Sequence, residues 1–232
     1  MLELLESGRI TDCELVPRSS NYTFLVLLEG GDGATCRAIY KPERGENPLR
    51  DFPYGSLGLR ERASYLVAEA LGWHFVPPTV VREGPHGPGS VQIYIDHDPT
   101  RHYFTLRDDY SLDFQRMFVF DWLTNNADRK AGHCLLSPEG AVWGIDHGLT
   151  FHAAHKLRTV IWDFANLPIP EQFLLDLERL GLRLDRLDGQ LAELPDLLQS
   201  QEIAALKRRR EAILVRRHFL DFSEGGVPWP YI

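Results

Sequence analysis

Two aspartates and a histidine lie near one another in the second half of the sequence. Asp128 belongs to the polar segment 125–130, and His133 follows five residues later. Asp146 comes directly after the apolar stretch 142–145. Phosphoryl transfer needs one carboxylate that orients the attacking hydroxyl and accepts its proton, and another that holds magnesium against the phosphate oxygens. This segment therefore contains the side chains that such chemistry requires.

The residues between the two acids predict a short β-hairpin. Segments 134–136 and 142–145 have the composition of short strands, and segment 137–140 between them contains proline and glycine, which is typical of a turn. We expect the hairpin to return the chain so that Asp146 lies close to Asp128.

His133 stands where protein kinases have an asparagine, five positions after the catalytic aspartate. Magnesium prefers oxygen ligands, whereas imidazole suits softer metals. Three roles for His133 are therefore open. It binds a metal through nitrogen, it donates a hydrogen bond to phosphate, or it orders the loop.

A lysine and a glutamate in the first half extend this pattern. The strand-like residues Ala-Ile-Tyr-Lys at 38–41 resemble the strand that presents the ATP lysine in protein kinases, and Lys41 is their last residue. Glu61 follows twenty residues later on a predicted helix, as the glutamate that pairs with this lysine does in kinases.

Two longer stretches resemble a known family. The segment 61–79 contains Glu, a helical pattern, Leu-Gly and then Val-Pro, and it is similar to the corresponding stretch of HipA-like bacterial kinases. The segment 120–130, which ends in Asn-Asn-Ala-Asp-Arg-Lys, resembles their catalytic loop and that of the phosphatidylinositol 3-/4-kinase superfamily. The chain thus looks like a compact bacterial branch of the phosphatidylinositol 3-/4-kinase-like proteins, over residues 40–148.

The resemblance implies a role for each matching residue. Lys41 would contact the phosphates with Glu61 as its partner, Asp128 would be the catalytic base, and Asp146 would hold the metal. His133 departs from the family pattern, and we expect it as a second candidate metal ligand. The remaining nucleotide contacts would come from the loop before the first strand of the hairpin and from a strand bordering the adenine; these residues are Ser19, Ser20, Asn21, Gln92, Tyr94 and Ile95.

The implied activity is transfer of the γ-phosphate of ATP to a hydroxyl, with Mg²⁺ or Mn²⁺ as the metal. We expect the acceptor to be a protein, this chain included, or a small molecule. Two alternatives remain: a non-catalytic regulator that binds ATP, and a metal-dependent hydrolase that combines the acids with His133, His147, His152 and His155. Transfer of AMP in place of phosphate is a further option.

The surrounding patterns predict strands first and helices second. The predicted strands are 23–28, 36–41, 76–81 (an edge strand), 91–95, 134–136 and 142–145, and the predicted helices are 59–71, 114–124, 170–180, 184–194 and 202–222. We expect an α+β fold, a single bilobal domain of the atypical protein-kinase-like type, with a small β-rich N-lobe (1–96) and a helical C-lobe (97–232).

The amino-acid composition argues against some classes of binding partner. Acidic residues (33) outnumber basic ones (25) in 232 residues, so attraction to nucleic acid or to anionic lipid is unfavourable. The sequence contains no apolar run long enough to span a bilayer, and its three cysteines lack metal-site spacing. We therefore expect a cytoplasmic protein without integral membrane association and without a nucleic acid partner.

Overall fold

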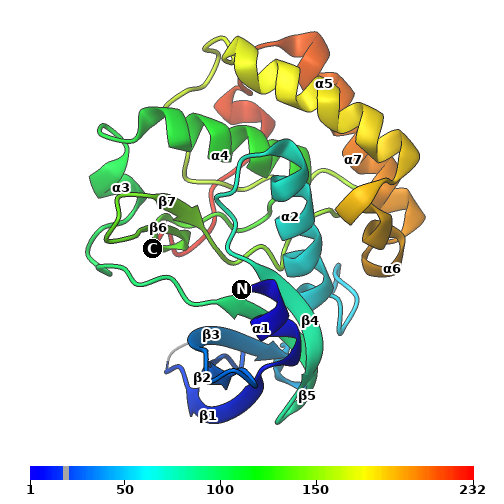
Figure 1. Ribbon diagram of the computed structural model, residues 1–232. Coiled ribbons are helices and arrows are strands. Elements are labelled where there is room, and N and C mark those ends of the chain that lie inside the picture. Colours follow the sequence, from blue (N-terminus) through cyan, green and yellow to red (C-terminus); the bar gives the residue numbers. More distant parts are fainter. Residues whose placement is uncertain (18–20) are drawn as a thin grey trace.

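A computed structural model describes residues 1–17 and 21–232 of the chain. Its N-terminal part is an antiparallel sheet with the strand order β1-β2-β3-β5-β4 among these described residues. The strands are β1 (Arg9–Leu15), β2 (Phe24–Glu29), β3 (Thr35–Pro42), β4 (Thr79–Gly84) and β5 (Gly87–Ile93). The sheet forms the lower part of the molecule in Figure 1.

One face of this sheet is apolar and covered. Side chains alternate across a strand, so Tyr40 and Lys41 on β3 project to opposite faces. Tyr40 is fully buried on the face that the short helix α1 (Leu2–Ser7) covers. We call the buried side chains of this face the sheet cluster; they are Leu5, Val26, Leu28, Ala38, Tyr40, Val80 and Val91. Lys41 is thereby directed towards the rest of the molecule.

The helix α2 (Leu57–Leu71) follows the loop after η1 (Glu43–Gly45) and ends at Gly72, whose φ of 72° is the left-handed conformation that glycine adopts readily. Figure 1 shows α2 rising from the sheet to the helices above it. Its apolar side chains pack with those helices in a second, larger group that we call the helical cluster. The members from α2 are Ala63, Tyr65, Leu66, Val67, Ala68 and Leu71.

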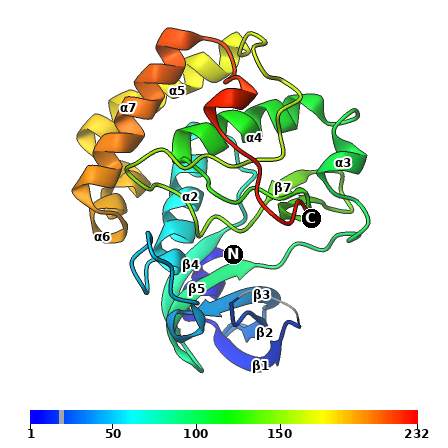
Figure 2. The ribbon, with the colours of Figure 1, turned by 180° about the vertical axis from the view of Figure 1, so that it is seen from behind.

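The C-terminal part is mainly helical and supplies the rest of the helical cluster. Its elements are α3 (Tyr103–Leu106), α4 (Ser111–Thr124), η2 (Ala131–His133), β6 (Cys134–Leu136), β7 (Val142–Gly144), α5 (Glu171–Arg186), η3 (Gly189–Glu193), α6 (Leu194–Leu197), α7 (Ser200–Arg216) and η4 (Phe222–Glu224). The C-terminal end returns to the middle of the molecule, beside β7 (Figure 2).

The architecture confirms the expected α+β fold, with a β-rich N-terminal part and a helical C-terminal part. The strand 76–81 was expected at an edge, and β4 is one of the two edge strands of the sheet. None of the helices in residues 1–17 and 21–232 combines the length and the apolar character that crossing a bilayer requires.

Two predicted helices were wrong in their extents. The helix expected over 184–194 does not form; α5 instead continues to Arg186, and the short helix α6 begins at Leu194. At Gly181 of α5 the Arg210 side chain of α7 packs closely, because a Cβ there would come within 2.1 Å of its guanidinium. The last helix was expected to reach 222, but α7 ends at Arg216.

Candidate active site

Lys41 lies where the sheet, α2 and the segment after β7 meet. Its Nζ is 2.7 Å from Glu61 Oε1 and 2.9 Å from Asp146 Oδ1. Burial alone would lower the pKa of Lys41, but the carboxylates of Asp146 and Glu61 more than reverse this and raise the pKa above its usual range. One ammonium group therefore joins residues from three separate parts of the chain.

Glu61 is buried although it lies on the opposite side of α2 from Ala63 and Leu66. Its side chain is 3% exposed. One carboxylate oxygen accepts from Lys41, and the other accepts the backbone N–H of His147 at 3.0 Å. Both oxygens are thus satisfied, which is the condition under which a buried carboxylate is tolerated.

Asp146 has an unusual backbone conformation, with φ at 59°. Aspartate is among the few non-glycine residues that adopt this left-handed region, at a cost of about 1–3 kcal/mol. The Lys41 ammonium holds the pKa of the Asp146 carboxyl well below its usual range, so the group is ionised. Its side chain remains 44% exposed, which leaves an anionic oxygen accessible from the solvent side.

Asp128 follows the end of α4, where Asn125 takes a left-handed conformation with φ at 56° and turns the chain out of the helix. The Asn126 amide oxygen accepts the backbone N–H of Asp128 at 3.0 Å and fixes the turn. The Asp128 carboxylate is 3.2 Å from Lys130 Nζ. Burial raises the pKa of Asp128, against the lowering effect of Lys130, and a raised pKa makes a carboxylate a better proton acceptor.

A buried ion pair that the sequence reasoning missed supports this loop. Arg129 and Asp121 are both 0% exposed, and their side chains are 3.0 Å apart. Arg129 also donates to the Ile145 carbonyl at 2.8 Å and lies 2.6 Å from Nε2 of His147. The pair therefore connects α4 to the segments around Asp128 and Asp146. A charged residue, Asp121, inside an apolar helical stretch was the available signal.

His133 lies between the two acids along the chain and contacts one of them. Its Nε2 is 3.3 Å from Asp146 Oδ2, while its Nδ1 accepts the backbone N–H of Lys130 at 3.3 Å. Burial, the largest cause, lowers the pKa of His133 to about 4. The neutral ring whose Nδ1 accepts has its proton on Nε2, so these contacts favour hydrogen-bond donation over metal ligation among the three roles.

The side chains of the centre fit a metal ion that is bound partly by the phosphates of a substrate. Among residues 1–17 and 21–232, no group of three or more His, Cys, Asp or Glu side chains is placed to hold a metal. Asp146 offers an ionised, exposed carboxylate, and magnesium typically takes one or two carboxylates while the phosphates of a substrate supply other ligands. The other histidines of the hydrolase alternative have separate hydrogen-bond partners: His147 contacts Arg129, His152 the Ala154 carbonyl and His155 the Glu224 carbonyl.

Further nucleotide contacts were expected from the loop before β2 and from β5. Ser19 and Ser20 lie outside the described residues. The Asn21 amide oxygen accepts the backbone N–H of Asn47 at 2.9 Å. The Gln92 side chain is buried and donates to Thr79 at 2.7 Å, so it is engaged within the sheet.

The chain after β5 leads from the sheet to the helical part. The Tyr94 backbone N–H donates to the Arg37 carbonyl at 3.0 Å, and the Ile95 carbonyl is 2.8 Å from Nδ1 of His97. The Arg37 guanidinium lies 4.7 Å from the centre of the Tyr94 ring. The roles of these residues beside adenine stay predictions.

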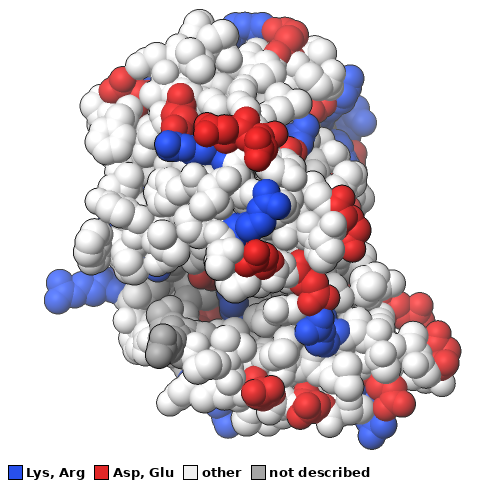
Figure 3. All heavy atoms as spheres, turned by 90° about the vertical axis from the view of Figure 1, so that its left-hand side faces the viewer, with Lys and Arg blue, Asp and Glu red and all other residues white. Residues whose placement is uncertain are grey.

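The surface is hollowed between its two parts. Figure 3 shows a depression between the larger upper part and the smaller lower part, with acidic and basic atoms inside it. Lys156 Nζ is 2.6 Å from Asp51. This pair joins the loop before α2 to the segment after Asp146.

Comparisons with known proteins agree with this arrangement. The model of the family described as phosphatidylinositol 3- and 4-kinase matches residues 79–174. Protein Rv2133c of Mycobacterium tuberculosis is 39% identical over 98% of this chain and 94% of its own length.

Two solved kinase structures are similar in fold. The crystal structure of the Golgi casein kinase with Mn/ADP bound has a TM-score of 0.61 at 15% identity, covering 100% of this chain and 79% of that one. The Helicobacter pylori proinflammatory kinase CtkA has a TM-score of 0.53 at 13% identity, covering 90% of this chain and 94% of that one. These likenesses show that the expected bilobal kinase-like fold is present.

Proposed function

Because the chain resembles the phosphatidylinositol 3- and 4-kinases over residues 79–174 and belongs to one family with protein Rv2133c, we propose that it transfers the γ-phosphate of ATP to a hydroxyl group. The observation that supports this most strongly is the position of Lys41, whose ammonium lies 2.7 Å from Glu61 and 2.9 Å from Asp146. It brings a phosphate-binding cation and a metal-binding anion to the same point between the sheet and the helices.

In this proposal each residue of the centre has a separate task. Glu61 fixes the direction of the Lys41 ammonium towards the phosphates. Asp146 holds Mg²⁺ or Mn²⁺, which when bound neutralises charge on the phosphate oxygens. His133 donates to Asp146 and keeps its carboxylate oriented.

Asp128 is the proposed catalytic base. It accepts the proton of the acceptor hydroxyl as the oxygen attacks the γ-phosphorus. The burial that raises its pKa favours this role, and Lys130 beside it limits the shift so that the carboxylate is still available as a base.

We propose a polypeptide hydroxyl as the acceptor, with a small molecule as the second choice. An extended segment of the chain itself already lies along this side of the centre: the Gly226 carbonyl accepts from Thr159 at 3.0 Å, and the Tyr231 carbonyl accepts from Ala131 at 2.8 Å. Ala131 belongs to the loop that follows Asp128, so backbone donors beside the proposed base are able to hold extended polypeptide. Figure 2 shows this C-terminal segment crossing the molecule to the region of β7.

The test uses ATP labelled at either the γ or the α phosphate. The purified protein, with magnesium and with or without cell extract, should transfer the γ label to protein and release ADP, and should leave the α label in solution. Transfer of the α label would show that AMP is moved instead. Binding of ATP with neither label transferred and no ADP formed would support the non-catalytic regulator.

A further inference from the structure

Arg60 directly precedes Glu61 in the first turn of α2, and it is buried without contacting Lys41. Only 2% of its side chain is exposed, and its guanidinium lies 5.0 Å from the centre of the Phe52 ring. Arginine carries its charge at every relevant pH, so such complete burial requires several specific partners.

Those partners belong to two distant parts of the chain. One terminal nitrogen of Arg60 donates to the Thr150 carbonyl at 2.5 Å, and the other contacts Glu202 Oε1 at 2.5 Å. Glu202 lies in the first turn of α7 and also accepts the Gln199 backbone N–H at 2.9 Å. The planar guanidinium thus bonds to a loop and to a helix at the same time. A lysine ammonium does not reproduce this forked geometry.

The loop that Arg60 contacts is the one that carries Asp146. Within it, the Thr150 hydroxyl donates to the His147 carbonyl at 2.7 Å, which closes the segment 146–150 on itself. The His147 N–H donates to Glu61 at 3.0 Å, and Ser64 of α2 is 3.3 Å from the Thr150 hydroxyl. Side chains at 60, 61 and 64 therefore attach this loop to α2 at three points.

From this geometry we propose that Arg60 is a positioning residue. It sets the register between Glu61 on α2 and Asp146 on the loop, so that one ammonium, Lys41, reaches both carboxylates. Glu202 completes the attachment by joining the same guanidinium to α7. The inference rests on the proposed phosphotransferase function for its kinetic consequence, but the loop geometry is measurable without it.

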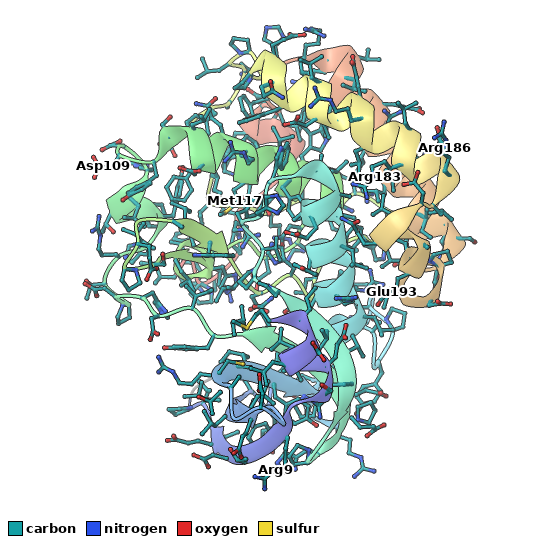
Figure 4. The ribbon with its side chains drawn as sticks, in the orientation of Figure 1. Arg9, Asp109, Met117, Arg183, Arg186 and Glu193 are labelled. Atoms are coloured by element: carbon teal, nitrogen blue, oxygen red, sulfur yellow. The ribbon has the colours of Figure 1, made fainter. Side chains whose placement is uncertain are left out.

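Arg62 provides a matched control on the same helix. Its side chain is 12% exposed, pairs with Glu193 at 2.7 Å and donates to the Thr79 carbonyl at 2.7 Å. Glu193, labelled in Figure 4, lies beside α2. Arg62 therefore anchors α2 through an arginine–glutamate pair as Arg60 does, but its side chain bonds to Glu193 and Thr79 and not to the loop 146–150.

The experiment compares Arg60→Met with Arg62→Met in hydrogen–deuterium exchange and in ATP turnover, well below the unfolding temperature of each. We expect Arg60→Met to speed exchange in peptides covering 146–151 and to lower kcat by about 10²-fold, the scale of a misplacement of about 1 Å. Arg62→Met should leave exchange in these peptides and kcat within about threefold of wild type, since catalytic groups keep their positions.

A second variant covers the case in which Arg60→Met folds poorly because it leaves Glu202 buried and unpaired. Arg60→Met combined with Glu202→Gln removes that charge and keeps an oxygen for the Gln199 N–H. It should recover stability, yet retain fast exchange at 146–151 and low kcat. The inference would be overturned if slow exchange at 146–151 and normal kcat returned together with stability. It would also be overturned if the Arg60 and Arg62 variants lost protection and kcat equally. If wild type transfers no phosphate, the proposed function fails, and exchange at 146–151 still decides the role of Arg60.

Discussion

The sheet cluster and the helical cluster differ in what they fix. The sheet cluster is small, comes from β2 to β5 and α1, and fixes the strand that presents Lys41. The helical cluster contains α2 as well as the C-terminal helices, and it fixes Glu61, Asp128 and Asp146. By packing, α2 thus goes with the C-terminal part, although by sequence it lies among the strands. The contacts of Lys41 with Glu61 and Asp146 consequently join one apolar unit to the other.

This difference indicates that the candidate site is built mostly on the helical part. Three of its four groups, Glu61, Asp128 and Asp146, lie on segments beside the helical cluster, and the Arg129–Asp121 pair and Arg60 connect these segments. The sheet supplies Lys41, the proposed phosphate-binding group. Substitutions on the two sides should therefore have different effects.

The largest loss of turnover is expected on the helical side of the centre, at Asp128. Asp128→Asn removes the proposed base but keeps the shape of the side chain, so turnover should fall by about 10²–10⁴-fold while ATP affinity is retained. Labelled-phosphate transfer and calorimetry measure the two quantities. Asp188→Asn, at a surface ion pair with Arg183, is the control and should behave as wild type. Near-normal turnover in Asp128→Asn would remove Asp128 from its role.

Truncation of a buried side chain in one cluster should destabilise that cluster and leave the local stability of the other unchanged. Phe118→Ala in the helical cluster should cost about 3–5 kcal/mol of stability, and Leu28→Ala in the sheet cluster about 2–5 kcal/mol, because both side chains are fully buried. In native-state hydrogen exchange, Leu28→Ala should weaken protection in β2 and β3 and leave α4 protected. Equal loss in α4 would mean that the two clusters open as one unit.

A smaller loss of stability is expected at Lys41, whose ion pairs join the sheet to the helical part. Lys41→Met leaves two carboxylates facing each other without a cation, and the buried one, Glu61, loses a partner, so stability should fall by about 1–3 kcal/mol. Magnesium should raise the melting temperature of this variant more than that of wild type, because a divalent ion replaces the missing ammonium. A thermal-shift titration with and without magnesium measures this, and an equal response of both proteins would argue against a shared cation position.

The smallest effect is expected at His133. If Nε2 donates to Asp146, His133→Asn supplies an amide donor in its place, and stability should change by no more than about 0.5–1.5 kcal/mol, the net value of one hydrogen bond. The preference between magnesium and manganese should remain as in wild type. A shift of preference towards magnesium in the variant, measured by nucleotide-linked metal titration, would instead identify the imidazole as a ligand.

Local pattern was enough to predict the parts of the centre that come from regular elements. Lys41 at a strand end, the helix with Glu61 and the hairpin before Asp146 all follow from alternation, helical spacing and turn residues. The prediction also placed Asp128 in the polar loop after a buried helix. These features depend on residues close in sequence.

Long-range partnerships were not predictable in the same way. Glu61 lies on the opposite side of α2 from Ala63 and Leu66, and its partners, Lys41 and the His147 N–H, are far away in sequence. The Arg60–Glu202 pair joins residues far apart in sequence, and no local pattern marks either as buried. The packing of Arg210 over Gly181 is likewise a contact between two helices, which no local pattern marks.

The most direct test of the account is calorimetry of ATP binding, with and without magnesium, to wild type and to Asp146→Ala. The account predicts that wild type binds ATP more tightly when magnesium is present, since Asp146 connects the metal to the phosphates. In Asp146→Ala most of this magnesium-dependent gain should be lost. An unchanged gain in the variant would contradict the assignment of Asp146 and, with it, the proposed phosphotransferase centre.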